Sequence, residues 1–65
     1  MKILINDQMI EIFEGARLQD AVRKYSETEL KLIEKEDRKI VDREGNILAL
    51  DGELSDGEYF YIIEC

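Results

Sequence analysis

The sequence lacks several residue types that have special structural or chemical roles in small proteins. It has no histidine, proline or tryptophan and only one cysteine, Cys65. A single cysteine cannot form an internal disulfide, and without histidine the usual Cys/His zinc sites are excluded. A lone thiol is typical of a reducing compartment, so we expect a cytoplasmic protein. The N-terminus shows no secretory leader and no apolar run approaches the length of a membrane span, so we expect no membrane association.

The chain is acidic, with 16 Asp and Glu against 9 Lys and Arg, and its net charge is −7 over 65 residues. The acids are spread along the chain rather than gathered in a tail. Because binding to nucleic acid needs clustered Lys and Arg, we expect no nucleic-acid partner. The charge is compatible with docking to a basic patch on another protein, and equally with the simpler role of keeping a small domain soluble.

No Ser/His/Asp group, phosphate-binding loop or dinucleotide fingerprint is present, so we expect no cofactor and no catalysis by this chain alone. The stretch "LDGELSDGE" does offer carboxylates that could bind calcium. The EF-hand spacing fails there, because the sixth position counted from Asp51 holds Asp56 where glycine is required. We therefore expect solvated turns and no metal site.

Two alternating apolar patterns at the N-terminus predict a β-hairpin. Ile3 and Ile5 share one face of the first strand, and Ile10 and Ile12 alternate in the same way in the second. The "NDQ" between them is turn chemistry, since Asn and Asp tolerate left-handed backbone at little cost. The period then changes to that of a helix over about 16–26, whose apolar stripe is Leu18, Ala21, Val22 and Tyr25.

The middle of the chain is ambiguous between strand and helix. We favour a third strand at 30–33, within "LKLIEK", from its place in the order of elements. The alternative is a second short helix, because Glu, Leu and Lys are good helix formers. A short strand is expected at 47–50 and a single apolar plug at Leu54.

The last predicted strand, 59–63, is apolar at every position, which is typical of a strand buried on both faces. A hairpin, one main helix and a last strand placed beside the first describe a ubiquitin-like β-grasp. We therefore predict a single α+β domain over 1–65, with a mixed sheet of four to five strands and the helix packed across it.

The sequence resembles the small sulfur carriers of thiamin and molybdopterin synthesis, the ThiS/MoaD family of β-grasp proteins. The likeness covers nearly the whole chain, through "MKILIND", "IEIFEGARLQDAVRKY", "KIVDRE" and "LSDGEYFYII". The resemblance implies docking to a ThiF/MoeB-like activating enzyme, which adenylates a C-terminal carboxylate that then receives sulfur. The family uses a mobile Gly-Gly tail for this step, whereas this sequence has Glu64 and Cys65 after the last strand.

Three interpretations of this ending are open. The chain is a β-grasp module whose continuation supplies the tail or another domain, or a protein that has lost carrier chemistry and keeps a docking surface. In the third, Cys65 itself is the carrier terminus and bears sulfur as a persulfide or a mixed disulfide. The third lacks a histidine to act as base, so an ordinary terminal cysteine is the simpler interpretation.

Alternation along the last strand predicts a partner site. Phe60 and Ile62 share the core side, and Tyr59, Tyr61 and Ile63 share the other side. We expect Tyr59 and Tyr61 to lie with Leu4 and Met9 on an open sheet face that binds a partner protein, although these tyrosines could merely cover the sheet. The main hypothesis is a sulfur-carrier-like protein, and its rival is a non-covalent protein-interaction domain or the module of a larger fusion. A minimal scaffold without a function is a third, weaker possibility.

Overall fold

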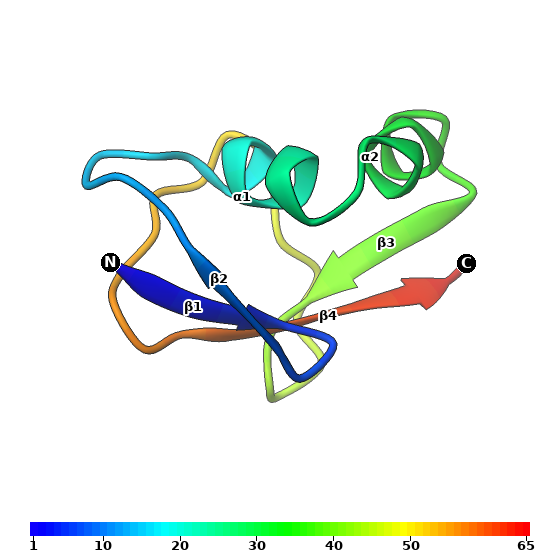
Figure 1. Cartoon of the computed structure of the whole chain (residues 1–65). Helices are drawn as coiled ribbons and strands as arrows, with labels where there is room; N and C mark the ends of the chain where they lie inside the picture. Colours follow the sequence, from blue (N-terminus) through cyan, green and yellow to red (C-terminus); the bar gives the residue numbers. More distant parts are fainter.

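The computed structural model, which describes residues Met1–Cys65, shows a four-stranded mixed sheet with two helices on one of its faces (Figure 1). The elements in chain order are β1 (Lys2–Ile5), β2 (Gln8–Glu11), α1 (Leu18–Tyr25), α2 (Glu27–Glu34), β3 (Arg38–Val41) and β4 (Tyr59–Glu64). The prediction of an α+β fold with a mixed sheet is confirmed. The prediction of a single main helix is wrong, because two helices of 8 residues each follow one another.

The N-terminal hairpin forms as predicted, with Ile5 paired to Gln8 across its turn. Asn6 and Asp7 are the two turn residues, and their φ angles are 50° and 66°. A type I′ turn requires left-handed backbone at both central positions, which Asn and Asp tolerate better than most other residues. The chemistry of these two residues therefore sets the register of the hairpin.

The last strand, β4, lies inside the sheet, whose order is β2-β1-β4-β3. It runs parallel to β1, with Leu4 beside Tyr59 and Ile5 beside Phe60, and antiparallel to β3. The prediction that the last strand inserts beside the first is confirmed. Since β4 has a strand on each side, it joins the N-terminal hairpin to β3.

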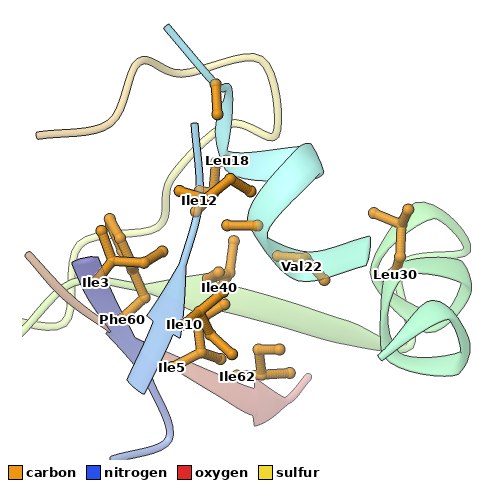
Figure 2. Packing of buried hydrophobic residues seen from close by; sticks show 12 residues of the cluster. Ile3, Ile5, Ile10, Ile12, Leu18, Val22, Leu30, Ile40, Phe60 and Ile62 are labelled. Carbon is orange, nitrogen blue, oxygen red and sulfur yellow. The ribbon is translucent and has the colours of Figure 1, made fainter. Parts of the chain in front are cut away.

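The core lies between the sheet and the two helices (Figure 2). The apolar stripe predicted on the first helix is confirmed, with Tyr25 partly buried at its end and the rest in the core. Leu54 packs against the same cluster, as expected of an apolar plug. The 12 buried residues of the cluster are Ile3, Ile5, Ile10, Ile12, Ala16, Leu18, Ala21, Val22, Leu30, Ile40, Phe60 and Ile62.

The segment 30–33, which we expected to be a strand, belongs to α2. Ser26 caps this helix, because its hydroxyl accepts a hydrogen bond from the Glu29 N–H at 3.2 Å. Leu30 is buried and Ile33 is partly buried, so helical spacing brings both to the core. The alternative of a second short helix is therefore correct. Ser-x-x-Glu is a helix start signature, and here it outweighs the order of elements that favoured a strand.

The strand expected at 47–50 is also wrong. Its contacts with β3 are an isolated bridge between Ile47 and Val41 and a hydrogen bond in which the Leu48 N–H donates to the Ile40 carbonyl at 2.9 Å. The strand lies just before it, at β3, where the neighbouring β-branched Ile40 and Val41 suit the pleated sheet. Residues after β3 thus cover part of its outer edge instead of extending the sheet.

Helix α2 ends in a Schellman motif. The Asp37 N–H donates to the Leu32 carbonyl at 2.9 Å, and the Glu36 N–H donates to the Ile33 carbonyl at 3.0 Å. This geometry holds Glu36 in the left-handed region with φ of 66°, where a Cβ atom is unfavourable. The helix therefore ends with glutamate at a position that usually holds glycine.

Replacing Glu36 by glycine is expected to raise the free energy of unfolding by about 1 kcal/mol, because the strain from the Cβ disappears while both hydrogen bonds remain. Urea unfolding followed by circular dichroism measures the change. Gly57→Ala is the matched control: it adds a Cβ at φ of 85° in open space, so it should destabilise. A Glu36→Gly protein less stable than wild type would contradict this account of the helix end.

Candidate functional site

Both helices pack on the same side of the sheet, so the opposite side has no covering layer (Figure 1). The register places Leu4 between Met9 of β2 and Tyr59 of β4, and paired residues point to the same side of a sheet. Tyr61 is paired with Val41 in the same way. We call the apolar set on this side the open face. Its members are Leu4, Met9, Val41, Tyr59, Tyr61 and Ile63.

The four side chains predicted as a partner site, Leu4, Met9, Tyr59 and Tyr61, therefore lie on one surface. Met9 is 61% exposed, and the other three are half-buried. The structure thus brings together the residues that the sequence pattern grouped. That they bind a partner stays a prediction.

Strand β4 is buried on one face only, contrary to the expectation of burial on both. Phe60 and Ile62 are in the core, whereas Ile63 is 41% exposed. The reason is that both helices lie on the side of Phe60 and Ile62, and no layer covers the other side. The apolar run at 59–63 therefore supplies a surface as well as a core.

Val41 shows that the open face holds a small hydrophobic cluster of its own. It is 5% exposed, yet it does not belong to the core cluster on the helix side. Tyr61 pairs with it across β4, and Ile47 bridges to it from the other side. Exposed apolar groups gathered in this way mark interaction surfaces more often than single exposed side chains do.

Arg43 joins the open face through its guanidinium, whose carbon lies 4.6 Å from the centre of the Tyr59 ring. The loop that carries it is held by Asp42, which accepts hydrogen bonds from the backbone N–H groups of Asn46 at 3.0 Å and Glu44 at 2.8 Å. These bonds, with those from Asn46 largest, hold the pKa of Asp42 below its ordinary value of 3.8. The carboxylate is therefore ionised at neutral pH, where it fixes the loop beside Tyr59.

The acidic residues of the loop before β4 serve the fold itself. Asp56 accepts a hydrogen bond from the Lys2 backbone N–H at 2.6 Å, and Glu58 accepts one from a backbone N–H of the same turn. Glu53 lies 3.4 Å from the Arg17 guanidinium. No three His, Cys, Asp or Glu side chains converge to hold a metal ion. Asp56 and Glu58 thus act as turn-forming groups, and Glu53 makes an ion pair.

Cys65 lies beyond the end of β4, at an apolar groove along the outer edge of β3. The groove has a volume of about 390 Å³ and is lined by Ile33, Ile40, Ile47, Leu48 and Leu50. The thiol is free and exposed. Because β4 continues to Glu64, Cys65 follows directly on the strand. The predicted carrier terminus therefore lies at the end of β4 that carries Ile63, and Lys39, which pairs with Ile63, lines the same groove.

Sequence reasoning missed two members of this surface, Val41 and Arg43. The signal for Val41 was weak, because the strand β3 was itself not predicted. Nothing in the sequence links Arg43 to Tyr59, since only the folded loop brings them together. Ile63 was placed on the correct side by alternation but was not included in the partner site.

Neither helix has the length and apolar character needed to cross a bilayer. Comparisons with protein-family models, curated proteins and solved structures found no match for this chain. The functional argument therefore depends on the residues of the open face.

Proposed function

We propose that this chain is a ubiquitin-like β-grasp domain that binds another protein non-covalently through the open face. The observation that carries the proposal is the uncovered apolar side of the sheet, where Met9 and Ile63 are exposed next to two half-buried tyrosines. The fold assignment is supported by the strand order β2-β1-β4-β3, by the parallel pairing of β1 with β4, and by a helix packed over the hairpin.

Burial of the open face would provide the driving force for binding. Removal of apolar surface from water contributes about 25 cal/mol per Å² before the costs of association are subtracted. Tyrosine and methionine are enriched at protein interfaces, and each tyrosine also carries a hydroxyl that reaches a polar partner. The sheet already holds these side chains in place, so binding orders little that was free.

Site-directed cross-linking tests the proposal. A photoreactive benzoylphenylalanine in place of Tyr61 is expected to cross-link to a partner in extracts of the native host. The same probe at Lys31, which is exposed on α2, should not. The partner is then purified, and its affinity for a Met9→Thr/Tyr61→Thr protein should be at least about tenfold weaker than for wild type.

Threonine is chosen for these substitutions because it keeps a high preference for strands while removing most of the apolar contact. Circular dichroism verifies that the double variant is folded. Equal affinity of the purified partner for wild type and the folded double variant would rule out the open face as the docking surface.

A second candidate is the sulfur-carrier role, in which a ThiF/MoeB-like activating enzyme is the partner. It is favoured by β4, which runs parallel to β1 inside the sheet and ends at Glu64, so that the chain leaves the sheet directly after this strand. In this chemistry a C-terminal carboxylate attacks the α-phosphate of ATP and pyrophosphate leaves. A sulfur donor then displaces AMP and leaves a thiocarboxylate.

Intact mass spectrometry tests this candidate after incubation with an activating enzyme of this type, ATP and a sulfur donor. The carrier role requires the mass increase of one carboxylate oxygen exchanged for sulfur. A Glu64→Gly/Cys65→Gly protein serves as the matched variant, because it restores the glycines of the family tail. Modification of the variant alone would show that the enzyme docks but does not accept a chain that ends in Glu64-Cys65. An unchanged mass in both proteins would exclude the role with that enzyme.

A further inference from the structure

The two edges of the sheet differ in how they are covered. The outer edge of β3 is covered at its C-terminal end, because the Leu48 N–H donates to the Ile40 carbonyl at 2.9 Å and the Asp42 N–H donates to the Asn46 carbonyl at 3.1 Å. The other edge is β2, the first strand in the order β2-β1-β4-β3, and no strand or isolated bridge lies outside it. Strand β2 therefore forms the open edge of the sheet.

The backbone of β2 presents hydrogen-bonding groups at this edge. Ile12 exchanges two hydrogen bonds with Met1: its N–H donates to the Met1 carbonyl at 2.8 Å, and its carbonyl accepts from the Met1 amine at 2.7 Å. Because inward and outward residues alternate in an antiparallel pair, Ile10 faces β1 in the same way, and the N–H and C=O groups of Met9 and Glu11 point outward. These outward groups suit the backbone of a further strand.

One of the outward groups has a partner within the chain. The Lys24 amine of α1 donates a hydrogen bond to the Glu11 carbonyl. A carbonyl oxygen has two lone pairs, so this bond leaves room for a second donor. The Met9 carbonyl and the N–H groups of Met9 and Glu11 make no hydrogen bond to a turn, a loop or a side chain. Pairing with a further strand therefore displaces no hydrogen bond of the sheet.

Apolar surface accompanies the open edge. Met9 is exposed on β2, and Phe13, two residues beyond the strand, is 64% exposed. A groove of about 400 Å³ lies between this end of β2 and the helices, and its lining consists of Ile12, Phe13, Asp20, Arg23, Lys24 and Glu27. Two acids and two bases line the groove, so its charges balance. A side chain that enters the groove therefore gains apolar contact with Ile12 and Phe13, whatever the sign of the charge around it.

We propose that an extended segment of another protein binds at the outer edge of β2 and adds a further strand to the sheet. The outward groups of Met9 and Glu11 exchange hydrogen bonds with the backbone of the segment, as in other cases of β-strand addition. Alternate side chains of the segment point to the helix side, where apolar ones contact Ile12 and Phe13 in the groove. The inference goes beyond the proposed function, because it concerns the edge of the sheet and not its uncovered side.

A second copy of the chain fits this edge less well than a segment of another protein. The helix-side residues of a second β2 are Ile10 and Ile12, which are already buried in their own core and cannot fill the groove of a neighbour. Each copy also carries a net charge of −7, and equal net charges oppose association. An extended segment without a core of its own has free side chains to place in the groove.

Nuclear magnetic resonance with a defined peptide tests the inference. The probe is a capped peptide of about eight residues in which Val alternates with Ser, and it is expected to bind with a Kd below about 1 mM. The same peptide with an N-methyl group on every residue has no backbone N–H to donate and should bind at least about tenfold more weakly. At saturation, amide hydrogen exchange of Met9 and Glu11 should slow at least about tenfold, while that of Ile10, which already faces β1, changes little.

A proline at the open edge provides the matching test on the protein. Glu11→Pro removes an outward N–H and leaves the pairing with β1 in place, because proline is tolerated on edge strands. It should bind the probe peptide at least about tenfold more weakly than wild type, whereas Glu11→Ala, which keeps the N–H, should stay within about twofold. Protection of the Ile10 amide verifies that the hairpin of Glu11→Pro is intact. If it is not, Met9→Pro serves in its place.

Several results would overturn the inference. They are a probe peptide that does not bind at about 1 mM, unchanged exchange at Met9 and Glu11 in its presence, or equal weakening by Glu11→Ala and Glu11→Pro. Loss of peptide binding in Tyr61→Thr but not in Glu11→Pro would place the peptide on the open face instead. A concentration-dependent dimer in sedimentation, abolished by Glu11→Pro, would identify a second copy as the occupant. Cross-linking from Tyr61 decides the docking function of the open face separately.

Discussion

Replacing Phe60 by alanine is expected to lower the free energy of unfolding by about 3–5 kcal/mol and to leave much of the protein unfolded at room temperature. Phe60 is 3% exposed and sits on β4 beside Ile5 of β1, in the part of the core that the helices cover (Figure 2). A domain of this length has a total stability of only about 3–10 kcal/mol, so a loss of this size takes most of it. Urea unfolding measured by circular dichroism checks the effect, since the chain has no tryptophan to report by fluorescence.

Ile63→Ala is the matched control for Phe60→Ala, because it lies on the same strand and points to the open face. This substitution also replaces a residue that favours strands by alanine. Because Ile63 is exposed, its removal leaves no cavity, and we expect the free energy of unfolding to fall by at most about 1 kcal/mol. Similar losses of stability in the two variants would mean that β4 does not bury one face and expose the other, and this would contradict the assignment of its two faces.

Replacing Asn6 by alanine is expected to cost about 2–4 kcal/mol, which is large for an exposed turn residue. Asn6 has two tasks in the hairpin and sheet, and its side-chain Nδ2 also donates a hydrogen bond to the Tyr25 hydroxyl at 3.2 Å. Its φ of 50° requires a residue that tolerates left-handed backbone, and its side-chain oxygen accepts a hydrogen bond from the Ile62 N–H at 2.9 Å. The hydrogen bond to Ile62 matters because β1 ends at Ile5, where the chain turns. The side-chain oxygen of Asn6 therefore accepts the β4 N–H that a further backbone carbonyl of β1 would otherwise accept.

Two further substitutions of Asn6 separate these tasks. Asn6→Gly keeps the backbone conformation but leaves the Ile62 N–H without its acceptor, so we expect a loss of about 1–3 kcal/mol. Asn6→Asp keeps both an acceptor and tolerance of positive φ, and it should stay within about 1 kcal/mol of wild type. Asn6→Ala combines an unpaired N–H with a strained backbone.

Amide hydrogen exchange at Ile62 provides the decisive measurement for the Asn6 series. Its protection should fall in Asn6→Gly and Asn6→Ala and should persist in Asn6→Asp. If Asn6→Gly is as stable as wild type and Ile62 stays protected, the side-chain bond contributes nothing and only the turn conformation matters.

Local chemistry made several features predictable from the residues alone. The turn at Asn6 and Asp7 depends on which side chains tolerate positive φ, and the helix stripe from Leu18 to Tyr25 depends on a period of 3.6 residues. Both properties belong to short segments, so they hold whatever the rest of the chain does. The Ser26-x-x-Glu29 start of α2 was an equally local signal, but the sequence analysis did not use it and favoured a strand from the order of elements.

Other features depend on contacts between distant segments and could not be obtained from any local pattern. Whether Arg38–Val41 or the stretch at 47–50 formed the strand was decided by which of them lies against β4. The stacking of Arg43 on Tyr59 and the bond from Ile62 to Asn6 likewise join residues far apart in the chain. Such contacts are absent from the unfolded chain, and their partners are chosen only when the sheet assembles.

The last strand shows both kinds of information in one element. Its alternation alone placed Phe60 and Ile62 on one side and Tyr59, Tyr61 and Ile63 on the other, because successive strand residues point in opposite directions. The sequence could not say whether the second side is covered, since all five residues are apolar. Only the tertiary structure decided this, by packing both helices on the side of Phe60 and leaving the tyrosines on the open face.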